Sequence, residues 1–198
     1  MVKNNKTKKY IKPNLRLSKT YSLVDYESNN GMLTTVWGPS MWHTLHAISF
    51  NYPVNPTNKE KQQYRHYIFS LKHILPCGKC RKNFSKNLKT LPLTIGHMKS
   101  RDTFSKYVYR LHEVVNDMLG KKSGLTYDDI RERYEHFRSR CTISLTKNKT
   151  HKNKKRIEDG CTEPLYGEKS KCILKIIPND EPCDTFQIDN KCIKTKIQ

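Results

Sequence analysis

Prolines and helix-capping residues divide the middle of this 198-residue chain into segments that each have the period of an amphipathic helix. Proline is favoured at the first position of a helix and ends one elsewhere, and a Ser or Thr three residues before an acidic residue forms a capping box. The predicted helices run from Pro39 to before Pro53, from Thr57 to Leu75, from the cysteines after Pro76 to before Pro92, from Ser100 to Gly120, and from Thr126 through Phe137.

Apolar residues recur three and four positions apart in these segments, which marks the face that packs in a core. The expected core positions are Trp42, Leu45, Ile48, Tyr52, Tyr64, Tyr67, Ile68, Leu71, Leu75, Phe84, Leu88, Phe104, Tyr107, Val108, Leu111, Val115, Leu119, Ile130, Tyr134 and Phe137. No convincing alternating strand separates the helices, so a thioredoxin-like βαβ unit is not expected. The predicted fold class is all-α: a four-helix bundle plus a short fifth helix.

The two ends of the chain differ from this middle. We expect a basic, disordered arm at residues 1–33, a helical domain at 34–140, and a Lys- and Cys-rich extension at 141–198. The extension contains only short β-prone pieces, at 173–177, 185–188 and 192–197. With so little apolar material it needs disulfides or a metal to become ordered, and otherwise stays disordered.

The charge of the chain is strongly positive, with 38 Lys and Arg against 18 Asp and Glu. Such a charge favours acidic partners, nucleic acid or anionic surfaces. The basic residues form no single dense block, so a solvated lysine-rich surface is the favoured interpretation and nucleic-acid binding is not expected. No apolar run is long enough to cross a bilayer and the N-terminus lacks a secretory signal, so no membrane association is expected.

Cys77-Gly78-Lys79-Cys80 is the segment with the clearest chemical meaning. Near a helix N-terminus, and beside Lys79, Arg81 and Lys82, a thiol pKa falls and the nucleophilic thiolate is favoured. The pair can also be half of a zinc site or a structural disulfide. Zinc sites need four ligands, and neither a second close pair of cysteines nor a suitably spaced histidine pair accompanies this one, so a redox pair is favoured.

A second set of residues has the properties of a cofactor site. Trp42 and His46 share one helix face, with His43 pointing elsewhere, and His112 and Asn116 share another. Lys121 follows the terminating Gly120. Together these side chains can hold a flat heteroaromatic cofactor and its phosphates, although each alone is more often a core, surface or helix-terminus residue.

The order of these motifs resembles the Erv/ALR family of FAD-linked sulfhydryl oxidases. The resemblance rests on Trp37-Gly38-Pro39, Trp42, Leu45-His46 and Tyr52-Pro53, then Pro76 to Cys80, then His112 to Asn116 with Leu119-Gly120-Lys121. It covers roughly residues 36–140. It implies a helical bundle that binds FAD, usually as a homodimer, and that oxidises protein thiols with molecular oxygen.

Carried over to this chain, the resemblance implies catalytic roles for Cys77 and Cys80 and no metal site. Cys77 would exchange disulfides with the substrate, and Cys80 would be the flavin-proximal thiol that passes electrons to FAD, with O2 reduced to H2O2. The implied cofactor-binding residues are Gly38, Trp42, His46, Cys80, His112, Asn116, Lys121 and Tyr134.

The chain also departs from the family pattern. Glu113 stands where the family often has Asn, Lys122 where it often has Pro, and the loops around the fourth helix lack cysteines. The missing cysteines, together with the Lys- and Asn-rich composition, favour a member from a large DNA virus over a mitochondrial one. We expect it to act in the host cytoplasm at the virus factory or in the virion rather than in the mitochondrial intermembrane space.

The spacing of the tail cysteines does not determine how they pair. Cys161 with Cys172 and Cys183 with Cys192 could form two loop disulfides, and Cys141 could pair with a tail cysteine or across a dimer. Structural disulfides are expected ahead of an electron shuttle, and a shuttle ahead of zinc. The alternative functions are a basic zinc- or nucleic-acid-binding protein and a catalytically degenerate flavoprotein scaffold.

Overall fold

The computed structural model describes residues 22–142, 160–183 and 186–194, with the backbone alone at 141–142. The chain divides into two compact units, Met1–Gly31 and Met32–Gln198. In the first, the described part contains one short helix, α1 (Leu23–Tyr26), which begins with a Ser22–Asp25 capping box. The sequence patterns had not indicated this helix.

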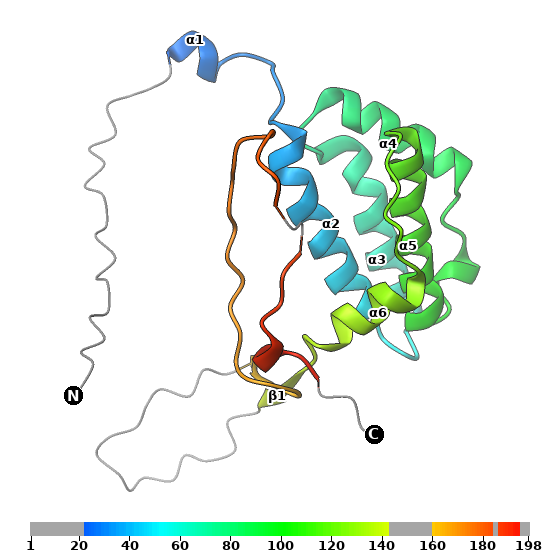
Figure 1. Ribbon diagram of the computed structural model, residues 1–198. Helices are drawn as coiled ribbons and strands as arrows, with labels where there is room; N and C mark the ends of the chain where they lie inside the picture. The colour runs from blue at the N-terminus through cyan, green and yellow to red at the C-terminus, as the bar shows by residue number, and fades with distance from the viewer. Residues whose placement is uncertain (1–21, 143–159, 184–185, 195–198) are drawn as a thin grey trace, which may run out of the picture. The chain divides into compact units, whose positions relative to one another are not determined.

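The second unit is built on helices, which confirms the predicted class. They are α2 (Thr34–Phe50), α3 (Asn58–Ile74), α4 (Gly78–Thr90), the 3-10 helix η1 (Ile95–Met98), α5 (Arg101–Met118) and α6 (Tyr127–Glu135). Helix α2 packs on α5, α3 packs on α4, and α6 contacts both α2 and α5 (Figure 1). No helix of the described residues is long and apolar enough to cross a membrane.

Local capping chemistry sets most helix ends where the sequence predicted them. At the start of α3, the Glu60 N–H donates to Thr57 Oγ1 at 3.2 Å, and the Thr57 N–H donates to Glu60 Oε2 at 2.8 Å. Ser100 and Thr126 cap α5 and α6 in the same way. Helix α5 ends at Met118, and Gly120 terminates it just after the C-cap Leu119, with a left-handed φ of +68° and the Lys121 N–H donating to the Asn116 carbonyl. This is the Schellman arrangement, which glycine adopts without strain.

The expectation that Pro39 occupies the first helical position is wrong. Helix α2 starts five residues earlier, at Thr34, and Pro39 lies inside it. Proline disfavours helical backbone in the residue before it through contact with that residue's Cβ. That residue is Gly38, which has no Cβ, so the helix continues through the proline.

The core lies between α2, α3, α4 and α5. Its most buried members include Tyr52, Ile68, Leu71, Phe104, Tyr107, Val108 and Leu111, all predicted. Leu119 was also predicted but is 53% exposed, because it lies beyond the end of α5. Phe137 is also exposed, after the end of α6. His46 and Ser49 are also buried in the core. The pattern of apolar residues had not predicted this, because both side chains are polar.

The described part of the tail contains a hairpin rather than the expected β-prone pieces. Strand β1 (Ser139–Thr142) pairs antiparallel with β2 (Gly160–Pro164), with Ser139 opposite Pro164 and a bulge between Arg140 and Thr142. Residues 173–177 form no strand, and Cys192 ends the 3-10 helix η2 (Asn190–Cys192). The rest of the expected pieces lies partly outside the described residues.

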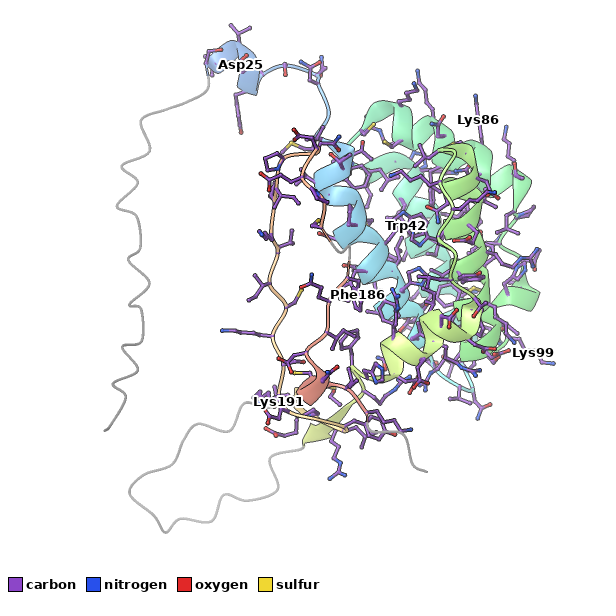
Figure 2. The ribbon with its side chains drawn as sticks, viewed as in Figure 1. Asp25, Trp42, Lys86, Lys99, Phe186 and Lys191 are labelled. Atoms are coloured by element: carbon purple, nitrogen blue, oxygen red, sulfur yellow. The ribbon has the colours of Figure 1, made fainter. Side chains whose placement is uncertain are left out.

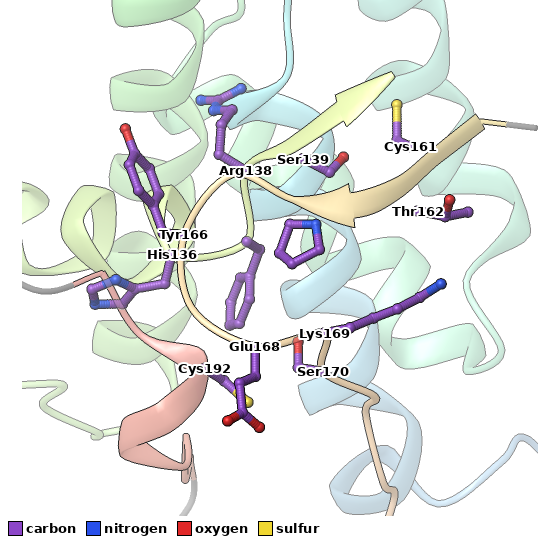
Figure 3. A pocket seen from close by; sticks show the side chains of 12 residues that line it. His136, Arg138, Ser139, Cys161, Thr162, Tyr166, Glu168, Lys169, Ser170 and Cys192 are labelled. Atoms are coloured by element: carbon purple, nitrogen blue, oxygen red, sulfur yellow. The ribbon is translucent and has the colours of Figure 1, made fainter. Parts of the chain in front are cut away.

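Backbone contacts hold this part of the tail to the end of α6. The Leu165 N–H donates to the Arg138 carbonyl at 2.8 Å, and the Lys194 N–H donates to His136 Nδ1 at 3.1 Å. A pocket of about 270 Å³ lies here, with Cys161 of β2 and Cys192 of η2 at different edges (Figure 3). The tail therefore packs against residues just after α6 instead of standing alone.

Candidate functional site

The two cysteines of the Cys77–Cys80 motif lie at the N-terminus of α4, as the proline before them predicted. Cys77 is the N-cap, and its Sγ accepts a hydrogen bond from the Cys80 N–H at 3.2 Å. The Arg81 guanidinium donates to the Leu75 carbonyl at 2.6 Å, which ties the first turn of α4 to the end of α3. Both cysteines are half-buried free thiols in this structure.

The surroundings shift the pKa values of the two thiols in opposite directions. Hydrogen bonding from the Cys80 side chain, and then from its backbone N–H, lowers the pKa of Cys77. Burial raises the pKa of Cys80, and its hydrogen bond to Cys77 raises it further. In the reduced pair Cys77 is thus the thiol that ionises first. The sequence-based expectation of a lowered pKa holds for Cys77 and fails for Cys80, because burial outweighs the helix terminus there.

Thr34, at the first position of α2, is a contact that sequence reasoning missed. Its Oγ1 lies 3.7 Å from Cys80 Sγ, within hydrogen-bonding distance for sulfur. The Met32 N–H donates to the Pro76 carbonyl at 2.8 Å, which brings the start of α2 to the motif. The hydroxyl is 46 residues away in sequence, so no local pattern could have found it.

The predicted cofactor residues Trp42, His46, His112 and Tyr134 come together between α2, α5 and α6. The rings of Trp42 and His112 stack with centroids 4.0 Å apart and planes 8° from parallel. His46 Nε2 lies 3.0 Å from His112 Nδ1. The rings of His46 and Tyr134 have centroids 5.5 Å apart. Figure 2 shows Trp42 between α2 and the helices behind it.

Both histidines of this cluster are neutral at ordinary pH. Burial, followed by the nearby His112 and His43, lowers the pKa of His46 to about 3. Burial also lowers the pKa of His112 to about 4. Burial raises the pKa of Tyr134, so its hydroxyl stays protonated and lies 3.1 Å from His43 Nδ1. The cluster is therefore an aromatic, uncharged environment.

One polar atom of this cluster lacks a partner. His46 is 3% exposed, and its Nδ1 has no hydrogen-bond partner among the described residues. Buried polar atoms are almost always satisfied, by protein, water or ligand. A cofactor that offers a hydrogen-bonding atom inside the bundle fits this position.

The remaining predicted residues lie on the same two helices but outside the ring contacts. Gly38 precedes Trp42 by one turn on α2. A Cβ built there meets only Thr34 Cγ2, at 3.8 Å, which is an ordinary van der Waals contact. Asn116 lies one turn after His112, and its Nδ2 donates to Glu113 Oε1 at 2.9 Å. Lys121 is exposed beyond the end of α5.

A row along α2 joins the thiols to the aromatic cluster. Thr34, Gly38, Trp42 and His46 are each four residues apart, so they share one face of the helix. The row spans roughly 18 Å at a rise of about 1.5 Å per residue. It begins at the contact with Cys80 and ends at the contact with His112. The row therefore connects the thiol pair with the two histidines along one side of α2.

The tail cysteines correct one expectation. Cys161 is disulfide-bonded, whereas Cys172, Cys183 and Cys192 are free thiols. Neither of the candidate pairs Cys161–Cys172 and Cys183–Cys192 is therefore formed. The side chain of Cys141 lies outside the described residues.

One further tail residue was missed and lies near the cluster. The ring of Phe186 lies 6.2 Å from that of His43 and 6.1 Å from that of Phe137, measured between centroids. The Arg133 guanidinium lies over the same ring at 5.5 Å. Phe186 falls within a β-prone piece with no helical period, so its docking onto α2 and α6 had no sequence signal.

Comparisons with known proteins agree with these motifs. The family model described as Erv1 / Alr matches residues 39–135. A probable FAD-linked sulfhydryl oxidase of Acanthamoeba polyphaga mimivirus is 40% identical over 99 residues, which are 50% of this chain and 68% of that protein. A putative FAD-linked sulfhydryl oxidase of Invertebrate iridescent virus 6 is 33% identical over 90 residues, which are 43% of this chain and 81% of that protein.

A cellular relative matches more weakly. The mitochondrial FAD-linked sulfhydryl oxidase of Saccharomyces cerevisiae is 29% identical over 104 residues, which are 52% of this chain and 51% of that protein. The crystal structure of the yeast Erv1 core superposes with a TM-score of 0.48 at 24% identity, covering 61% of this chain and 95% of that one. On the family match and the two viral relatives, the chain belongs to the Erv1/Alr family, and viral proteins are among its relatives.

Proposed function

We propose that this protein is an FAD-dependent thiol oxidase, which forms disulfides in protein dithiols with O2 as the final acceptor. The row of residues on α2 carries the proposal. It connects a thiol pair that can exchange disulfides with a buried, neutral, aromatic cluster suited to a flavin nucleotide. The names of the viral and yeast relatives support the same activity.

The residues present fit FAD. The rings of Trp42, His112 and Tyr134 would pack against its planar portions, and the unpartnered His46 Nδ1 would meet one of its polar atoms. Gly38 has no side chain and would let the cofactor approach the helix backbone, and Asn116 and Lys121 would meet the polar nucleotide end. The chemistry that bound FAD supplies is two-electron acceptance from the reduced cysteine pair and transfer to O2, which gives hydrogen peroxide.

The chain's own cysteines carry out the thiol exchange. In the oxidised pair, a substrate thiolate attacks Cys77 Sγ, which forms a substrate–Cys77 disulfide and releases Cys80 as the thiolate. The second substrate thiolate then attacks the substrate sulfur of that bond. The substrate leaves oxidised by two electrons, and Cys77 and Cys80 hold those electrons as a reduced pair. The lowered pKa of Cys77 makes it a good leaving group in this second step.

Thr34 and the N-terminus of α4 favour the thiolate form of Cys80, which passes electrons to FAD. The Thr34 hydroxyl and the first-turn N–H groups stabilise negative charge on the Cys80 sulfur, at the Thr34 end of the row.

Purification and oxygen uptake test the proposed activity. The protein is expected to be yellow and to consume O2 with dithiothreitol, producing one hydrogen peroxide for each disulfide. A colourless protein that contains stoichiometric zinc would contradict the proposal and favour the basic zinc-binding alternative. A yellow protein that consumes no O2 with any dithiol would identify a flavoprotein scaffold.

We also propose that the protein is a homodimer and acts in the host cytoplasm or the virion. Membership of the family supports the first, and the viral relatives support the second. Light scattering is expected to give twice the 23.4 kDa mass of the chain. A monomeric mass for the flavin-loaded protein would rule the dimer out. Fractionation of infected cells should find the protein outside mitochondria, and its recovery from the intermembrane space would reject this location.

A further inference from the structure

The helices on either side of the thiol pair contain an unbroken excess of positive charge. Between Glu60 and Asp102 the chain has ten Lys and Arg residues and no Asp or Glu, which is half of the net charge of +20. None of these ten cations forms an ion pair with a described residue. The excess is therefore not neutralised by the part of the protein that the structure describes.

Four of these cations form a stripe on α4. Lys79, Lys82, Lys86 and Lys89 are separated by three, four and three residues, so they lie on one helix face, and all four are exposed. The stripe starts between the two cysteines of the motif. Figure 2 shows Lys86 on the outer side of the molecule.

Exposed apolar side chains lie at the thiol end of this stripe. Met32 is 71% exposed, Leu33 68% and Ile74 62%. The hydrogen bond from the Met32 N–H to the Pro76 carbonyl brings Met32 and Leu33 close to Cys77, because Pro76 is the residue before it. Ile74 is three residues from Cys77 in sequence. Exposed apolar side chains and the first lysine of the stripe therefore lie near Cys77, the thiol proposed to exchange with substrate.

We propose that this surface, formed by Met32, Leu33, Ile74 and the α4 lysine stripe, is the docking site for an acidic dithiol protein. This inference rests on the proposed oxidase function and specifies its substrate class. The substrate places an apolar side chain on the patch and carries Asp or Glu around its cysteine pair. A cationic field raises the association rate of acidic partners and stabilises the approaching thiolate.

The apolar patch favours a protein over a nucleic acid as the occupant. A nucleic acid can neutralise the lysines through its phosphates. It brings no thiol to Cys77, however, and its backbone offers nothing to three exposed aliphatic side chains. An acidic polypeptide satisfies the charge, the apolar patch and the chemistry together.

Two synthetic dithiol peptides test the proposal. They share one sequence, with a Leu near the cysteine pair, and differ in having Glu or Lys residues around the pair. With the full-length flavin-loaded protein at about 0.01 M salt, we expect kcat/KM to be about tenfold higher for the Glu peptide. The preference should shrink at about 0.3 M salt, where screening acts within a few ångströms.

Charge reversal locates the effect on α4. Lys86 and Lys89 lie at least roughly 13 Å along the helix from Cys77. The K86E/K89E double variant should therefore lose most of the preference for the Glu peptide and keep its turnover of dithiothreitol. The matched control is K59E/K106E, which changes the net charge equally. Lys59 lies in the first turn of α3 and Lys106 in the second turn of α5, at the end of the bundle where Arg101 contacts the Tyr52 carbonyl. This control should keep the preference.

A third variant tests the apolar patch. Ile74→Ser should raise KM for both peptides severalfold and leave turnover of dithiothreitol unchanged.

The outcomes separate this proposal from the function on which it rests. No turnover of dithiothreitol by the wild type contradicts the oxidase itself. Equal kcat/KM for the two peptides, or the same loss in the control as in K86E/K89E, overturns the docking surface alone. Tight binding of a DNA duplex that K86E/K89E abolishes, without any peptide preference, would assign the stripe to nucleic acid instead.

Discussion

Thr34 shows how one hydroxyl can set the chemistry of a thiol that is far away in sequence. Burial raises the pKa of Cys80, and the Thr34 hydroxyl offsets part of that rise. The same hydroxyl also contributes to the lowered pKa of Cys77. Thr34 is thus a positioning residue, which acts on the reaction through the sulfur atoms.

Thr34→Val is expected to shift the rise of kcat to higher pH, because the isosteric side chain cannot stabilise a thiolate. Thr34→Ser should restore the wild-type profile. The pH profile of turnover with dithiothreitol measures both. An unchanged profile in Thr34→Val, at unchanged flavin content, would show that this contact does not act on the thiols.

The neutral histidines make stability depend on pH. His46 and His112 have folded-state pKa values of about 3 and about 4, below the ordinary value of 6.5. Below pH 6.5 the unfolded chain binds protons that the folded chain excludes. The stability associated with keeping them neutral is therefore complete above pH 6.5 and is lost as the pH falls towards these folded values.

We expect the free energy of unfolding to fall between about pH 6.5 and about pH 4.5, and to fall less steeply in His46→Gln. Denaturant titrations across this range measure the slope. His66→Gln, on the exposed face of α3, is the control and should keep the wild-type slope. A His46→Gln slope as steep as the wild type would contradict the buried neutral state of His46.

Individual elements were the part of the fold most readable from sequence. The capping boxes at Thr57 and Thr126, the cap at Ser100 and the stop at Gly120 depend on residues within one turn of each other, and all were correctly placed. The start of α2 was misplaced because the tolerance of Pro39 depends on the glycine before it. The β1–β2 pairing was missed because it joins segments about twenty residues apart.

Removal of the α3 cap should cost measurable stability. Thr57→Ala deletes the side-chain acceptor for the Glu60 N–H and the partner of its carboxylate, so we expect a loss of about 0.5–2 kcal/mol. Thr90→Ala, an exposed Thr at the end of α4, is the matched control and should change stability by less than about 0.5 kcal/mol. Equal losses in the two variants would mean that the cap contributes nothing.

At the scale of the whole molecule, the site is assembled by packing between distant helices. His46 and His112 are 66 residues apart yet share a hydrogen bond, and Thr34 and Cys80 meet across 46 residues. Motif resemblance identified most of the cluster residues, but sequence spacing does not encode which side chains touch. The sequence also did not predict the position of Phe186 or the disulfide bonding of Cys161, because both depend on how the tail folds onto α6.

We propose that the Cys77–Cys80 pair and the α2 row form one path between substrate thiols and FAD. It is tested most directly by anaerobic mixing of the flavin-loaded protein with excess dithiol while the visible flavin band is followed. Rapid bleaching is expected in the wild type and in a Cys172→Ser control, and none on that timescale in Cys80→Ser with its flavin still bound. Bleaching of Cys80→Ser at the wild-type rate would contradict it.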